Sequence, residues 1–192
     1  NDMWCIYQSR GTGGTGSALE LKIYDSSANA WLSGGNLASD LVADSVHFQF
    51  DSVSRHSDDN AIVTVASNVR DAGTTGSVRF YSIGGSNLIT KKTDIFQSAT
   101  NFFGGLPSIL LNQQNNDIYV NYQQDRLTGS VVYKKSADGG DTWGNQTGMS
   151  QTQGNITSIM GGTSIGNDGG RFQPVWFNDD LSDLVTNRLN SI

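Results

Sequence analysis

The feature that most constrains the fold of this chain is an internal repeat of 55 to 58 residues. Four short apolar runs, each followed by a polar and turn-rich segment, have the composition of buried β-strands. Their first residues are separated by 58, 56 and 55 positions, and the runs are 3–9, 61–67, 117–123 and 172–178. A period of this length predicts repeated supersecondary units that bury their apolar faces against one another.

A second series of strand-like segments follows the same period. Each segment begins with small or polar residues soon after one of the first runs, and three of the four reach a tyrosine. These are Tyr24, Tyr81 and Tyr133, separated by 57 and 52 positions. Trp31 and Trp143 are 112 residues apart, which is twice 56. Further strand-like pieces, such as 87–91 and 108–111, lie between these runs, so we expect four short strands per unit.

The composition favours an all-β fold. The chain of 192 residues has 23 glycines but only one glutamate, Glu20, and five lysines, so the residues that usually cover exposed helix faces are scarce. Serine, threonine, asparagine and glycine suit strand faces and turns. Hydrophobic residues make up 36% of the chain and are spread along it, which excludes disorder as the main state.

Charge and hydropathy exclude two classes of partner. The net charge is −6 and the 12 lysines and arginines are scattered, so we expect no binding of nucleic acid. No run approaches the roughly 18 apolar residues of a membrane span, so we expect no membrane insertion. Cys5 stands alone in an apolar run and is expected to pack as a small hydrophobic side chain.

Tandem four-stranded antiparallel units of about 50 residues predict a β-propeller, in which neighbouring sheets cover each other's apolar faces. We name the strands of each unit a to d in chain order. Residues 1–192 are expected to form one partial propeller, with approximate blades 1–40, 41–98, 99–153 and 154–192. The first blade lacks strand a and the last lacks strand d. This indicates either a fragment with additional blades elsewhere or blades completed by neighbouring subunits.

One short motif follows strand c of the third unit. Segment 136–143 reads Ser-Ala-Asp-Gly-Gly-Asp-Thr-Trp, with Ser136, Asp138, Gly140, Thr142 and Trp143 as its motif residues. It resembles the Asp box of sialidases and other bacterial-neuraminidase-repeat propellers. In a turn between strands c and d, Asp138 can accept backbone N–H bonds, Gly140 can take a positive φ and Trp143 can pack into the sheet. The resemblance implies a structural box, on the propeller face away from the active site.

The opposite face of the predicted propeller holds the b–c loops, and three of these loops carry an arginine soon after strand b. The three are Arg10, Arg70 and Arg126. Arginine forks bind carboxylates in a bidentate manner. Sialidases use an arginine triad on this face, so the resemblance implies a site for an acidic glycan. Alternatively, these residues are solvated loop charges, since Arg70 precedes Asp71 and Arg126 follows Asp125.

The residues needed for catalysis are incomplete. The resemblance to sialidases implies a tyrosine nucleophile activated by a glutamate, with an aspartate as acid and base. The only glutamate is Glu20, in an alternating strand where we expect it to face solvent. His47 and His56 have no histidine or cysteine cluster that would make a transition-metal site. We therefore expect no catalytic residue, no metal site and no cofactor in this chain.

Three functions are compatible with the sequence. The first is a non-catalytic propeller that serves binding or structural display on an extracellular, cell-surface or virion protein, with an acidic glycan as candidate ligand. The second is part of an exo-sialidase-like glycoside hydrolase whose catalytic residues lie mostly in other blades. The third is a structural protein whose terminal blades are completed by neighbouring subunits. The scarcity of lysine and glutamate and the missing catalytic set favour the first function.

Overall fold

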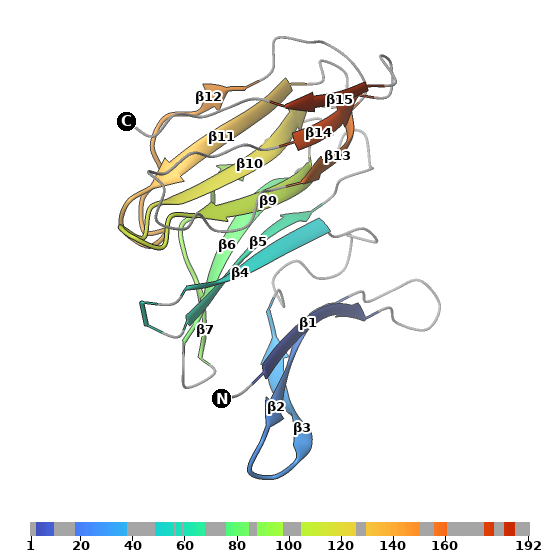
Figure 1. The fold of residues 1–192 in the computed structure, drawn as a ribbon, viewed down its shortest axis with the longest axis vertical. Helices are drawn as coiled ribbons and strands as arrows, with labels where there is room; N and C mark the ends of the chain where they lie inside the picture. The colour runs from blue at the N-terminus through green and yellow to red at the C-terminus, as the bar shows by residue number, and fades with distance from the viewer. Residues whose placement is uncertain are drawn as a thin grey trace. The chain divides into compact units, whose positions relative to one another are not determined.

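A computed structural model describes most of the strand-forming parts of the chain (Figure 1). The described residues are 3–9, 18–37, 49–55, 57–58, 60–67, 76–84, 88–97, 105–125, 130–149, 156–160, 175–178 and 183–186. Every regular element within these segments is a β-strand. The prediction of an all-β fold made of antiparallel sheets is therefore confirmed.

The strands form four antiparallel sheets whose members are neighbours in chain order. The first sheet contains β1 (Met3–Ser9), β2 (Ala18–Asp25) and β3 (Ala30–Asn36). The second contains β4 (Gln49–Arg55), β5 (Asn60–Ser67), β6 (Ser77–Ile83) and β7 (Ile89–Lys91), with β8 (Phe96–Gln97) paired to β6. The third contains β9 (Gly105–Leu111), β10 (Ile118–Asp125), β11 (Ser130–Ser136) and β12 (Thr147–Gly148). The fourth contains β13 (Ile156–Met160), β14 (Val175–Asn178) and β15 (Asp183–Thr186).

The pairing order repeats the predicted sequence of strands a to d. In the described part of the chain, the third sheet has all four strands, the first has b, c and d, and the fourth has a, b and c. The chain divides into two compact units, residues 1–48 and 49–192. The assignment of 1–192 to one partial propeller, with blade boundaries near 40, 98 and 153, stays a prediction.

In the first unit, one face of the central strand β2 is buried. Leu19, Leu21 and Ile23 of the central strand β2 are at most 4% exposed. The opposite face carries Cys5, which is exposed, and Trp31, which is 48% exposed. The predictions that 3–9 forms a buried strand and that Cys5 packs as a small hydrophobic side chain are wrong. In the edge strand β1, Met3, Cys5 and Gln8 are exposed and the other residues are half-buried, so no residue of this strand is fully buried.

In the second unit, the second and third sheets lie next to each other and share a hydrophobic core (Figure 1). Ile62 and Phe80 of the second sheet are fully buried in one cluster with Val120 and Tyr122 of the third. Burial of each such side chain is worth about 1.5–3 kcal/mol. We call this contact the seam; it holds the two sheets face to face.

Polar side chains add a second connection, between strands β4 and β9. Asp51 Oδ2 accepts hydrogen bonds from the backbone N–H of Ile109 at 3.0 Å and from the hydroxyl of Ser108 at 3.1 Å. Gln49 Oε1 accepts the backbone N–H of Leu106 at 2.5 Å. Leu106 has a φ of 51°, a left-handed conformation that is rare for a bulky residue. The bond to Gln49 helps to hold this unfavourable backbone in place.

We expect Asp51→Ala to lower the free energy of unfolding by about 1–3 kcal/mol, because the partly buried donors of Ser108 and Ile109 lose their acceptor. Chemical denaturation measures this change. Ser52→Ala is the matched control, since Ser52 is the exposed neighbour on the same strand. Equal stability of the two variants would contradict a role for Asp51 in joining the sheets.

Candidate functional site

The Asp-box turn connects β11 to β12 and is held by the carboxylate of Asp138. Asp138 Oδ1 accepts the backbone N–H of Thr142 at 2.9 Å, and Asp138 Oδ2 accepts the Thr142 hydroxyl at 2.5 Å. The Ser136 hydroxyl donates to Asp138 Oδ1 at 2.8 Å and accepts the backbone N–H of Gly140 at 2.9 Å. The motif residues therefore satisfy one another's hydrogen bonds within the turn.

Two glycines let this turn approach the second sheet closely. Gly139 and Gly140 have φ values of 73° and 93°, which glycine adopts without steric cost. A Cβ atom on Gly140 would lie 2.4 Å from the ring of Phe80. Trp143 packs edge to face on Phe80, with ring centroids 5.2 Å apart, and donates its Nε1–H to the carbonyl of Thr93 at 3.0 Å. The turn thus fixes the third sheet to the second.

The hydrogen bonds of the turn also set the ionisation of Asp138. The Thr142 hydroxyl, the Thr142 backbone N–H and the Ser136 hydroxyl lower the pKa of Asp138 from 3.8 to about 2. All of its described partners lie within the turn. The chemistry of this carboxylate is that of a structural turn.

The low pKa of Asp138 makes stability depend on pH. Because the folded pKa of about 2 lies below the ordinary 3.8, the stabilisation is present above about pH 4 and is lost as the pH falls toward 2. We expect Asp138→Asn to melt at a lower temperature than the parent at pH 6 and at nearly the same temperature at pH 2. Thermal melts across this range test the claim, and a gap that stays constant would contradict it.

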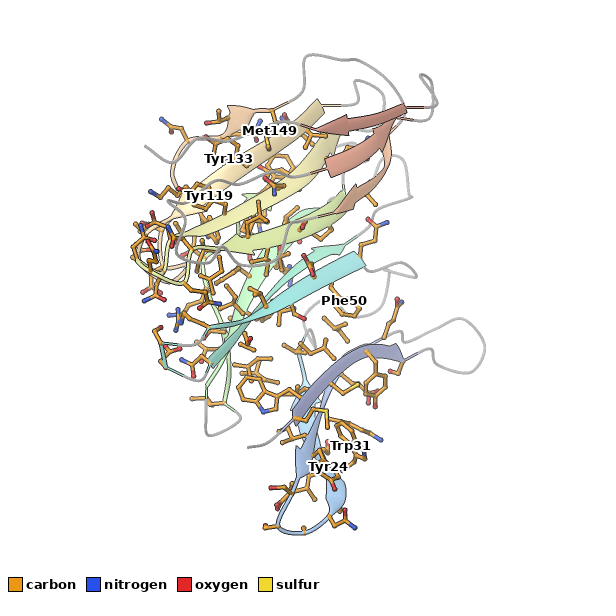
Figure 2. All side chains as sticks on the ribbon, viewed as in Figure 1. Tyr24, Trp31, Phe50, Tyr119, Tyr133 and Met149 are labelled. Atoms are coloured by element: carbon orange, nitrogen blue, oxygen red, sulfur yellow. The ribbon has the colours of Figure 1, made fainter. Side chains whose placement is uncertain are left out.

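A related turn in the first sheet uses a different aspartate. Asp25 Oδ1 accepts the backbone N–H groups of Ser27 at 2.8 Å and of Ala28 at 3.1 Å, and it also accepts the Ser27 hydroxyl. The bond from the Ser27 hydroxyl, followed by the two backbone bonds, lowers the pKa of Asp25. Trp31 packs against Tyr24 at a centroid distance of 5.5 Å (Figure 2). The sequence window aligned with the Asp box, residues 24–31, keeps the tryptophan and loses the other consensus residues, so the capping role of Asp25 could not be read from the motif.

The three arginines predicted to bind an acidic glycan lie outside the described residues; they are Arg10, Arg70 and Arg126. The b strands before them are described, and they end at Ser9, Ser67 and Asp125. Antiparallel order puts these strand ends at the end of each sheet opposite to the Asp-box turn. The arginine site therefore stays a prediction about this end of the sheets, which we call the b–c end.

The first sheet also carries a tyrosine and a glutamate in direct contact near its b–c end. Tyr7 of β1 lies opposite Glu20 of β2 in the sheet register, and the Tyr7 hydroxyl donates to Glu20 Oε2 at 2.6 Å. Lys22 Nζ lies 5.9 Å from the centre of the Tyr7 ring. Sequence analysis identified Glu20 but not its partner, because the pairing register decides which side chain lies opposite it.

The hydrogen bond fixes the proton of this pair on Tyr7. Bonding to Glu20, followed by partial burial, raises the pKa of Tyr7. Hydrogen bonds from Ser9 and from Tyr7 lower the pKa of Glu20. Glu20 is therefore an ionised acceptor beside a neutral phenol. Both shifts widen the gap between the two pKa values, so the resting pair holds its proton on Tyr7 and opposes its transfer to Glu20.

Other site types find no support in the described segments. Their histidine, cysteine, aspartate and glutamate side chains include no group of three that could hold a metal ion. His47 and His56 lie outside these segments. The described strands and turns include no helix long and apolar enough to cross a membrane.

Comparison with known proteins identifies the fold. No family model matches the chain, and no curated protein matches its sequence. Among solved structures, it is similar to an alpha-L-arabinanase of Penicillium chrysogenum complexed with arabinobiose, with a TM-score of 0.61 and 10% identity. This match covers 99% of the chain and 60% of the arabinanase.

Two sialidases are also similar in structure. A Hadza microbial sialidase matches with a TM-score of 0.51 and 11% identity, covering 90% of this chain and 41% of that one. The intramolecular trans-sialidase of Ruminococcus gnavus, in complex with oseltamivir carboxylate, matches with a TM-score of 0.51 and 12% identity, covering 97% and 48%. The chain thus spans about half the length of these enzymes. At such low identities the likeness concerns the fold alone, and that fold is a β-propeller of antiparallel sheets.

Proposed function

We propose that this chain is a sialidase-like propeller that binds glycans without cleaving them, with a preference for acidic sugars. The observation that carries the proposal is the position of the three arginines relative to strand b. Strands β1 and β10 end one residue before Arg10 and Arg126, and β5 ends three residues before Arg70. Each arginine thus follows the same strand of its own sheet, and guanidinium groups bind carboxylates bidentately.

The proposal includes a setting for this binding activity. A polar surface with one glutamate and five lysines suits structural display on an extracellular, cell-surface or virion protein. Further blades of the parent protein, or neighbouring subunits, would complete the propeller. Trp31 and Met3 support such a partner, because they are 48% and 57% exposed on one face of the first sheet.

The glycan site is tested with single and triple arginine variants. We expect Arg10→Ala, Arg70→Ala and Arg126→Ala each to weaken binding of N-acetylneuraminic acid about tenfold to a hundredfold, because each removes a charge-assisted hydrogen bond. Isothermal titration calorimetry measures the affinities. Thermal melts check that the variants remain folded.

Arg55→Ala provides the matched control for these variants. It removes the same charge from the last residue of β4, at the end of the second sheet opposite to the b–c end, where Arg55 pairs with Asp58. Its affinity for the sugar should equal that of the parent. Undiminished binding by the triple arginine variant would refute the glycan site.

One observation favours a second candidate function, glycoside hydrolysis. The Tyr7 hydroxyl lies 2.6 Å from Glu20, so Glu20 can take the phenolic proton as the Tyr7 oxygen bonds to the anomeric carbon of a sialoside. The bond from that carbon to the aglycone oxygen breaks in the same step, and the aglycone oxygen takes its proton from an acid. The aspartate acid and the arginines would have to come from the remainder of the propeller.

This second function makes its own prediction. In a propeller that includes the remaining blades, a chromogenic sialoside should be hydrolysed by the parent and left intact by Tyr7→Phe and Glu20→Gln. Tyr24→Phe is the matched control, because its hydroxyl donates to Asn29 rather than to a carboxylate. Absence of turnover by the parent, with sugar binding retained, would reject the enzyme and leave the binding function standing.

A further inference from the structure

Two amide side chains of the third sheet are buried without hydrogen-bond partners. Asn121 is fully buried and Gln123 is 3% exposed. Neither Nδ2 nor Oδ1 of Asn121 has a partner, and neither has Nε2 of Gln123. A buried polar group left unpaired has lost its hydrogen bonds to water without gaining others, which destabilises the fold. Exchanging the positions of the Asn121 amide nitrogen and oxygen would still leave both atoms without a hydrogen-bond partner.

The two amides share one face of β10. Ile118, Val120 and Tyr122 of this strand belong to the seam with the second sheet, so the alternating positions face the other way. That second face includes Asn121, Gln123 and Tyr119; Tyr133 lies opposite Asn121 on β11, with its ring centre 6.1 Å from that of Tyr119 (Figure 2). Strand β13 packs beside β9 and β10 in the same unit.

The backbone beside these amides is irregular. In the pairing of β10 with β9, Asn121 lies opposite Ser108 and Gln123 lies opposite Gly105, so β9 contains one extra residue between these pairs. Leu106, with its positive φ, is part of this bulge. Bulges commonly redirect the chain next to binding sites.

The repeat shows how the same position is filled elsewhere. Thr64 of β5 precedes Asn121 by 57 residues; it is also fully buried, but its hydroxyl donates to the carbonyl of Arg79 at 3.2 Å within its own sheet. Ile6 of β1 precedes Thr64 by 58 residues and carries no polar atom on its side chain. Both alternatives leave nothing unpaired, so among the first three sheets the unpaired amide belongs to the third.

The unpaired amide atoms determine which chemical group can bind to them. Asn121 needs one donor and one acceptor, and Gln123 needs an acceptor, a combination that a hydroxyl group supplies. Lys135, the cation described on this face, forms an ion pair with Asp117, with Nζ 2.7 Å from Oδ2. The described residues of this face therefore do not favour an anionic ligand. The Cα atoms of residues two apart on a strand are separated by about 6.7 Å. One oxygen atom that makes a hydrogen bond of about 2.9 Å to each side chain can bridge this distance.

We infer that Asn121 and Gln123 form a binding site for a neutral hydroxyl group, supplied by an ordered water molecule or by a saccharide. This site is independent of the arginines at the b–c end. Its oxygen can bond to Gln123 Nε2 and to one amide atom of Asn121, both of which the protein itself leaves unpaired.

A crystal structure at high resolution, from crystals grown without sugar or polyol, tests the inference. We expect a density peak about 2.7–3.2 Å from an Asn121 amide atom and from Gln123 Nε2. A second crystal soaked in N-acetylneuraminic acid separates the two sources. An unchanged peak identifies water, and a peak replaced by a sugar hydroxyl identifies a saccharide. Absence of density at the amides in both crystals overturns the inference.

Asn121→Thr is the matched variant, because it introduces the residue that the second sheet has at the equivalent position, Thr64. Its hydroxyl can donate to the carbonyl of Val132, as Thr64 does to Arg79, so we expect the peak to disappear and the melting temperature to be equal or higher. Thr64→Val, the control, should leave the peak in place. A peak that persists in Asn121→Thr, or a guest lost from Thr64→Val, would contradict the assignment of the site to Asn121 and Gln123.

Discussion

The apolar contact between stacked sheets is the constraint on which the rest of this structure depends. A three- or four-stranded sheet of short strands with two apolar faces cannot bury both alone, so it needs a neighbouring sheet on each side. The seam between the second and third sheets meets this need with fully buried side chains such as Ile62, Phe80 and Val120. The Asp-box turn is adapted to the same contact, since Gly140 leaves room for the Phe80 ring and Trp143 covers it.

Within each sheet, the c–d turn and the proposed ligand-binding loop lie at opposite ends. In the c–d turns, the carboxylates of Asp138 and Asp25 accept backbone N–H groups of the turn itself. These carboxylates therefore serve the turns. At the b–c end, the strands lead into the arginine-bearing loops on which the proposed glycan site rests. The Tyr7–Glu20 pair lies near that end of the first sheet. A propeller can thus change its ligand chemistry without disturbing the contacts that stack its sheets.

Much of the fold could be predicted from the sequence, because strand positions follow from period and composition. The predicted 3–9 strand coincides with β1, and the repeat located the b and c strands of all four sheets. The exposure of Cys5, the contact of Tyr7 with Glu20 and the isolation of Asn121 could not be predicted. These depend on which residue lies opposite which and on what covers each face, and a one-residue shift in register exchanges the two faces of a strand.

Native-state hydrogen exchange tests the central claim, that the second and third sheets are stabilised as one cooperative body by the seam. We expect amides of β5, β6, β10 and β11 to exchange slowest, with a common free energy of opening. We expect Gly140→Ala to lower this free energy in both sheets by about the same amount. If the variant lowered protection only in the third sheet, the two sheets would open independently, and the account would be wrong.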